Sequence, residues 1–122
     1  MAIRVLIVED SPAMRQLLRL ALRAYHGIDI IEAQDGVEAL KALAQGRYDV
    51  VFADLNMPIL DGMKLIRRVR DDPAHAGTQI VVVTNEDSPD VERQALELGA
   101  NHFVKKPVNR RAIDRVLRDL LP

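Results

Sequence analysis

Residues 5–12 read Val-Leu-Ile-Val-Glu-Asp-Ser-Pro, a short apolar run followed by two acidic residues and a serine–proline pair. Four consecutive apolar residues without alternation are typical of a strand that helices cover on both faces. Ser11 then offers a capping hydroxyl, and Pro12 suits the first turn of a helix. The stretch therefore predicts a buried strand that leads directly into a helix, with two carboxylates at the junction.

The same order of strand and helix recurs along the chain. Four further apolar runs rich in β-branched residues precede amphipathic segments, at residues 28–31, 50–52, 80–83 and 102–104. Short right-handed β/α crossovers favour a parallel five-stranded sheet with helices on both faces. The predicted fold is α/β, a doubly wound (βα)5 three-layer sandwich, in which ligands bind beyond the carboxyl ends of the strands.

The expected helices carry apolar residues at helical spacing over residues 14–25, 37–43, 65–69, 91–98 and 113–120. Start signals are Ser11, Asp35 with Glu38, and Ser88, and end signals are Gly27, Gly46 and Gly99.

Composition limits the classes of protein to which the chain can belong. The 122 residues are 48% hydrophobic and 29% charged, so we expect residues 1–122 to form one compact domain. The absence of cysteine excludes disulfides and thiolate metal sites. A net charge of −1 argues against bulk attraction to nucleic acid or anionic membranes. With no signal peptide or spanning segment at the start, we expect a cytoplasmic protein. His26, His75 and His102 are dispersed, and we interpret them as structural.

Polar residues follow four of the five strands. Glu9 and Asp10 follow the first, Asp54 the third, Thr84 the fourth and Lys106 the fifth. Because the carboxyl ends of parallel strands share one edge, these side chains should meet there. Two carboxylates about 4 Å apart repel by about 4 kcal/mol at an effective dielectric near 20. A hard divalent cation relieves that repulsion, and an all-oxygen site suits Mg²⁺.

The remaining space at this edge suits a phosphoryl group. A carboxylate oxygen of Asp54 can attack phosphorus and form an acyl phosphate, while Lys106 neutralises the transferring charge. The Thr84 hydroxyl can donate to a phosphoryl oxygen and draw its loop inward.

Four segments, residues 6–10, 54–58 with 61–62, 83–84 and 103–107, together resemble the CheY-like response-regulator receiver family of two-component signalling. The resemblance covers essentially the whole chain. It implies the flavodoxin-like strand order 2-1-3-4-5, which is carried over from the family and does not follow from the sequence pattern.

The resemblance also assigns roles around the metal. It implies that Asp54 is phosphorylated, and that Asp10, Asp54 and the backbone carbonyl of Asn56 hold Mg²⁺. Glu9 is expected to act through a water molecule. Lys106 matches the family lysine because it immediately precedes Pro107, and the family bond at that position is usually cis.

Further roles concern the switch and the lifetime of the phosphorylated state. Thr84 and Lys106 are implied to contact the phosphoryl group, and Phe103 occupies the aromatic switch position, where it lacks the hydroxyl of tyrosine. Asn56 and Glu86 match a pair beside the path of hydrolytic water, which implies fairly rapid dephosphorylation. Asn85 departs from the usual Ala or Gly and is expected to narrow access to the phosphoryl group or donate to it.

These roles lead to a stand-alone receiver in a phosphorelay, a signalling switch whose only chemistry is self-phosphotransfer and autodephosphorylation. The expected donor is a histidine kinase or phosphotransfer protein that approaches the first helix. The output protein is expected on the face of the fourth helix, fifth strand and fifth helix. We expect a monomer with no direct nucleic-acid or membrane contact, acting in chemotaxis or motility. Arginines are frequent on both helices, Arg15, Arg19 and Arg23 on the first and Arg110, Arg111, Arg115 and Arg118 on the fifth. The first set is most simply a solvated face.

Three alternatives compete with this interpretation. A haloacid dehalogenase-like phosphatase would need an acid two residues after its nucleophile, where this chain has Asn56. A receiver that docks a partner independently of phosphate is disfavoured by the intact pocket. A nucleotide-binding domain lacks support because no glycine-rich loop follows the first strand.

Overall fold

The computed structural model describes residues 3–57, 59–86 and 88–120, so residues 1–2 and 121–122 of the expected domain and Pro58 of the quoted motif lie outside the described part. The elements are β1 (Ile3–Val8), α1 (Pro12–Leu22), β2 (Ile28–Ala33), α2 (Gly36–Gln45), β3 (Val50–Ala53), α3 (Gly62–Asp71), the short 3-10 helix η1 (Pro73–His75), β4 (Gln79–Thr84), α4 (Pro89–Leu98), β5 (His102–Lys105) and α5 (Arg110–Leu120). The five predicted β/α units are confirmed. Within the described ranges, no helix has both the length and the apolar character needed to cross a membrane.

The five strands form one parallel sheet in the order β2-β1-β3-β4-β5, as expected. In the register, Val5 of β1 lies beside Ile30 of β2 on one side and Val50 of β3 on the other. After β2 the chain crosses over β1 to form β3, so the strand order reverses between β1 and β3. The crevice beyond these two strands is where such sheets bind ligands.

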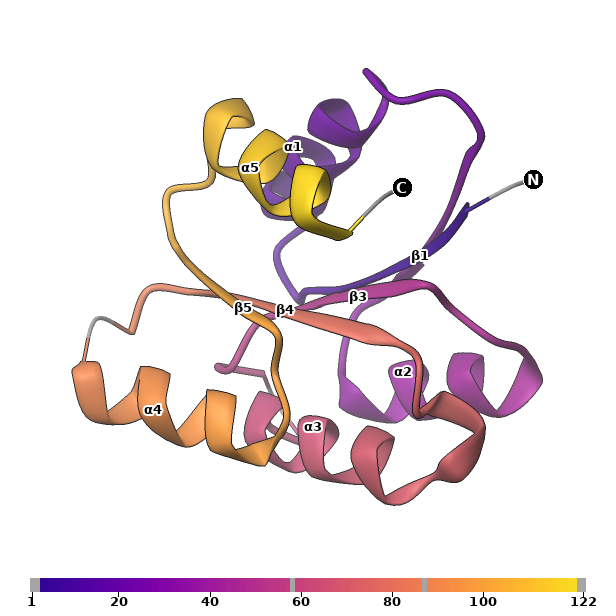
Figure 1. The fold of residues 1–122 in the computed structure, drawn as a ribbon, viewed down its shortest axis with the longest axis vertical. Helices are drawn as coiled ribbons and strands as arrows, with labels where there is room; N and C mark the ends of the chain where they lie inside the picture. Colours follow the sequence, from indigo (N-terminus) through magenta and orange to yellow (C-terminus); the bar gives the residue numbers. More distant parts are fainter. Residues whose placement is uncertain (1–2, 58, 87, 121–122) are drawn as a thin grey trace.

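Helices cover both faces of the sheet, α1 and α5 on one and α2, α3 and α4 on the other (Figure 1). Alternate residues of β1 face opposite sides of the sheet and pack beneath different helices. Val5 and Ile7 pack in the core beneath α1 and α5, whereas Leu6 and Val8 pack in the core beneath the other three helices. All four are fully buried. This two-sided burial explains why the strand is continuously apolar rather than alternating.

Polar side chains fix the starts of four helices. The side chains of Ser11, Asp35, Asp61 and Ser88 each accept a hydrogen bond from a backbone N–H in the first turn of the following helix. Such caps satisfy a donor that the helix cannot pair internally, and each stabilises the helix by about 1 kcal/mol. The caps therefore set where α1, α2, α3 and α4 leave the ligand-binding edge of the sheet.

The end of α1 differs from the prediction. Apolar spacing predicted a helix through Tyr25 and a terminal Gly27, but α1 ends at Leu22. Tyr25 still packs against the core beneath α1 and α5, and its hydroxyl donates to Asp114 Oδ1 at 2.6 Å. Gly27 has a φ of 75° and precedes β2, which extends to residue 33 rather than 31. The spacing correctly placed Tyr25 against the core, but it did not predict where the helix ends.

Candidate functional site

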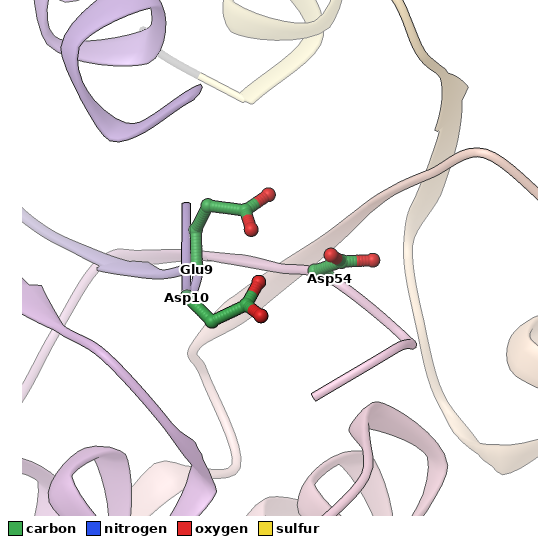
Figure 2. Close-up of side chains that lie close together, drawn as sticks. All are labelled: Glu9, Asp10 and Asp54. Atoms are coloured by element: carbon green, nitrogen blue, oxygen red, sulfur yellow. The ribbon is translucent and has the colours of Figure 1, made fainter. Parts of the chain in front are cut away.

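Three carboxylates meet where the strand order reverses. Glu9 and Asp10 follow β1, Asp54 follows β3, and each offers an oxygen within 4.8 Å of the other two. Figure 2 shows the three side chains extending from the ends of these strands toward one region. Glu9 is 2% exposed and Asp54 is 5% exposed, whereas Asp10 is exposed. The predicted acidic cluster is therefore assembled, with one member open to solvent.

Lys106 reaches this cluster from the end of β5. Its Nζ lies 2.7 Å from Glu9 Oε1 and 3.0 Å from Asp54 Oδ2, so one ammonium bridges the two buried carboxylates. The Lys106 backbone N–H donates to the carbonyl of Thr84 at 2.7 Å, which ties the lysine to the end of β4. The peptide bond between Lys106 and Pro107 is cis, as the resemblance implied.

Burial and charge shift the pKa values of this pair. Burial raises the pKa of Glu9 above its ordinary value, and the hydrogen bond from Lys106 offsets only part of that effect. Burial acts to lower the pKa of Lys106, but its hydrogen bonds to Glu9 and Asp54 outweigh burial and leave that pKa above its ordinary value. Lys106 is therefore a fixed positive charge at neutral pH.

Backbone amides hold the other polar side chains. The N–H of Asn56 donates to Asp54 Oδ1 at 3.1 Å, and the N–H of Glu86 donates to Thr84 Oγ1 at 3.2 Å. Thr84 is fully buried, whereas Asn56, Asn85 and Glu86 are exposed around the cluster. The structure thus brings the strand-end residues together and places Asn56, Asn85 and Glu86 at the solvent-exposed edge of the acidic cluster.

Phe103 lies in β5, directly beside Val82 of β4 in the sheet. Its ring is half-buried and packs against the core beneath α2, α3 and α4. It is two residues ahead of Lys105, which pairs with Thr84. Phe103 therefore belongs to the strand next to Thr84, on the side of the sheet where α4 lies.

Arg15 corrects the interpretation of the first helix as a solvated basic face. Its Nη1 donates to the backbone carbonyl of Glu9 at 2.7 Å, and its Nε lies 3.1 Å from Glu32 Oε1. Only 17% of its side chain is exposed. The guanidinium therefore joins α1 to the strand end that carries the acidic pair. Periodicity alone could not separate it from Arg19 and Arg23, because the partner carbonyl belongs to the backbone.

Gly62 has a role that the motif did not explain. A Cβ at this position would lie 2.5 Å from the backbone oxygen of Asp54 and 2.6 Å from Cα of Leu55. The Gly62 N–H also donates to the carbonyl of Leu55 at 3.0 Å. Only glycine lets α3 begin against the segment that follows Asp54.

The donor set fits a hard divalent cation. All three side chains supply carboxylate oxygens, the ligands that Mg²⁺ prefers, and the exposed position of Asp10 leaves the cluster accessible. Lys106 balances part of the negative charge of the two buried members, and a cation beside Asp10 would balance the remainder. The residues could therefore hold Mg²⁺ next to Asp54.

Comparison with known sequences places the chain in a family. The family model described as the response regulator receiver domain matches residues 5–118. The chain is 36% identical over 119 residues to a gliding motility regulatory protein of Myxococcus xanthus, covering 93% of this chain and 15% of that protein. It is 38% identical over 107 residues to the response regulator MprA of Mycobacterium sp. strain KMS, covering 88% of this chain and 45% of MprA. The chain therefore spans less than half the length of these relatives.

Solved structures agree with this assignment. The chemotaxis response regulator CheY4 of Vibrio cholerae superposes with a TM-score of 0.90 at 31% identity, covering 99% of this chain and 100% of CheY4. The receiver domain of the sensor histidine kinase PA1611 from Pseudomonas aeruginosa PAO1 gives a TM-score of 0.86 at 26% identity, with 98% of each chain covered. That structure has a magnesium ion coordinated in its active-site cleft. With its fold, its strand-end cluster and its match over residues 5–118, the chain belongs to the response regulator receiver domain family, the signalling switches of two-component systems.

Proposed function

We propose that the chain is a cytoplasmic receiver that accepts a phosphoryl group on Asp54 from a histidine kinase or phosphotransfer protein. The observation that carries the proposal is the surroundings of Asp54. Its carboxylate lies 3.0 Å from the Lys106 ammonium and within 4.8 Å of the other two acidic side chains. A nucleophile, a fixed positive charge and a cation-binding donor set therefore adjoin one another.

The proposed step is a transfer between two atoms. An oxygen of Asp54 forms a bond to phosphorus as the bond from phosphorus to the donor's imidazole nitrogen breaks, and the electron pair of that bond stays with the imidazole. The N–H of Asn56 holds Asp54 Oδ1 at 3.1 Å and orients the carboxylate. Lys106, which faces Oδ2, stabilises the negative charge of the transferring group.

Mg²⁺ is the proposed cofactor. Asp10, Asp54 and the backbone carbonyl of Asn56 would hold it directly, and Glu9 would act through a water molecule. The acidic cluster of Glu9, Asp10 and Asp54, and the magnesium ion coordinated in the cleft of the PA1611 receiver domain, support this cofactor. When bound, the ion supplies positive charge for the phosphoryl oxygens.

The proposed output is a rearrangement that begins at Thr84. Its hydroxyl accepts from the N–H of Glu86, so turning that hydroxyl toward a phosphoryl oxygen would change the start of the loop before α4. Phe103, half-buried in β5, would follow by changing its burial. The output protein that recognises this change would bind the face of α4, β5 and α5, where Arg111, Arg115 and Arg118 are exposed. A coupling of about 1 to 3 kcal/mol would be enough.

Three exposed side chains would set how long the phosphorylated state lasts. Asn56 and Glu86 are proposed to lie beside the path of the hydrolytic water and to permit fairly rapid dephosphorylation. Asn85 is proposed to narrow access to the phosphoryl group or to donate to it. A short-lived signal carried by a monomer would suit motility control, and the relatives in chemotaxis and gliding motility support that role.

The test uses acetyl phosphate and Mg²⁺ as the phosphodonor system. The wild-type chain should gain one phosphoryl group, detected as retarded migration in a phosphate-affinity gel, and Asp54→Asn should gain none. Asp119→Asn, an exposed change on α5, is the matched control and should behave as the wild type. An unmodified wild-type chain, or equal modification of Asp54→Asn, would contradict the proposal.

A further inference from the structure

A groove of about 520 Å³ runs between α3 and α4 on the surface of the molecule. Its volume is within the range of sites that bind ligands. The floor is apolar and consists of Leu55, Met63, Val91 and Leu98. Met63, Val91 and Leu98 are only half-buried although they pack on the core beneath these helices. The groove therefore leaves apolar side chains of the core partly uncovered.

The wall of the groove on α3 is basic. Lys64 and Arg67 lie three residues apart on one face of α3, and both are exposed. Neither forms an ion pair with any residue that the structure describes. The opposite wall on α4 contributes the uncharged Gln94. One side of an apolar floor is thus lined by two cations whose charges are not neutralised by the described part of the chain.

The end of the groove nearest the acidic cluster has the opposite charge. Asp61 and Glu86 line it together with Asn56. Two carboxylates at this end would repel the phosphates of a nucleic acid, and two cations are few for an electrostatic nucleic-acid site. The charge pattern instead fits a protein segment whose apolar residues are flanked by carboxylates on one side.

We propose that this groove docks an acidic amphipathic helix of a partner protein. The apolar stripe of that helix would pack on Met63, Val91 and Leu98, and its carboxylates would pair with Lys64 and Arg67. The residues from Val91 to Leu98 span about 10 Å along α4, which equals about two turns of a docked helix. The groove lies on the α3 side of α4 and is separate from the face of α4, β5 and α5. Binding does not require phosphorylation of Asp54, so the unmodified chain tests it.

The experiment selects ligands without prior choice of sequence. Immobilised wild-type protein is used to enrich a phage-displayed library of randomised helical peptides, and the enriched peptides are synthesised and titrated by fluorescence anisotropy. The double variant Lys64→Glu with Arg67→Glu reverses the charge of the α3 wall. The matched control, Lys41→Glu with Arg47→Glu, reverses two exposed cations in and just after α2, which do not line the groove and lie outside the face of α4, β5 and α5. Thermal melting monitored by circular dichroism confirms that both variants are folded.

The proposal expects enriched peptides with an apolar stripe bordered by Asp or Glu. Their affinity should fall about tenfold or more for the α3 reversal, because each change there replaces an attraction by a repulsion, and should stay unchanged for the Lys41 and Arg47 control. Methyl resonances of Met63, Val91 and Leu98 should shift on binding. No enrichment, enrichment of basic peptides, equal affinity for the α3 reversal, or binding of a single-stranded DNA oligonucleotide in place of the peptides would overturn it.

Discussion

Replacing Lys106 by methionine tests the electrostatic balance of the site. The Lys106 ammonium lies 2.7 Å from Glu9 Oε1 and 3.0 Å from Asp54 Oδ2, and these carboxylates are 2% and 5% exposed. Methionine retains much of the side-chain volume without the charge. The variant Lys106→Met therefore leaves two buried carboxylates facing each other with no cation between them.

The size of the effect follows from these distances. At an effective dielectric near 20, each contact with Lys106 is worth about 6 kcal/mol of Coulomb attraction, and desolvation of the three groups offsets much of it. Removing one partner of a buried ion pair typically destabilises a protein by about 3 to 5 kcal/mol. We expect Lys106→Met to lose that much free energy of unfolding at pH 8.

The loss should depend on pH with a defined sign. The pKa of Lys106 is raised above 10.5 in the folded chain, so its stabilising contribution is complete below pH 10.5 and is lost as the pH rises through the folded value. The pKa of Glu9 is raised above 4.5, chiefly by burial, and the variant removes the Lys106 hydrogen bond that lowers it. Protonation of Glu9 on the acid side of its folded pKa would relieve the repulsion. The deficit of Lys106→Met relative to wild type should therefore shrink from pH 8 to pH 5.

Guanidinium unfolding followed by far-ultraviolet circular dichroism at both pH values measures this deficit. Lys41→Met is the matched control, because Lys41 is exposed on α2. A stability loss for Lys106→Met no larger than that of Lys41→Met at pH 8, or an equal deficit at both pH values, would show that Lys106 does not balance the buried carboxylates.

Three further predictions concern backbone and metal. Gly62→Ala should lose about 1 to 3 kcal/mol of unfolding free energy, because its Cβ would lie 2.5 Å from the backbone oxygen of Asp54. Gly77→Ala is the control in the same thermal-melting experiment. It should lose no stability, because no described atom lies within 4 Å of the added Cβ. Ile59 has a φ of 72° and is 79% exposed, so Ile59→Asn should gain about 1 kcal/mol in chemical unfolding, and an unchanged or lower stability would contradict that account of strain. Asp10→Asn should weaken Mg²⁺ binding about tenfold or more, as measured by calorimetry, because it removes one carboxylate ligand. The variant should not lower the free energy of unfolding, since Asp10 is exposed near two other carboxylates. An unchanged affinity for Mg²⁺ would show that Asp10 is not a ligand.

Most of the fold could be predicted from local sequence because each signal has a local cause. The run at residues 5–8 is apolar because both faces of β1 are buried, and the caps at Asp35 and Ser88 act on the next turn of their own helices. The end of α1 could not be predicted in this way. Tyr25 keeps the helical spacing of a buried residue, but its hydroxyl bonds to Asp114 of α5, a contact that the local sequence does not encode.

The residues of the functional site also differ in whether the local sequence predicts their contacts. The strand-end positions of Glu9, Asp54 and Lys106 could be predicted, because parallel strands bring their carboxyl ends to one edge. The contact of Arg15 with the carbonyl of Glu9 and the approach of α3 at Gly62 depend on backbone atoms that carry no residue-specific signal. The groove between α3 and α4 likewise depends on how two helices pack.

Asp54, rather than a neighbouring carboxylate, is the proposed acceptor of the phosphoryl group. Glu9 and Asp10 each offer an oxygen within 4.8 Å of Asp54, so the three must be told apart chemically. Borohydride reduces an acyl phosphate to an alcohol and marks the carbon that carried it. After treatment with acetyl phosphate and Mg²⁺, borohydride reduction and peptide mass spectrometry should find homoserine at position 54. Reduction at position 9 or 10, with position 54 intact, would contradict the account.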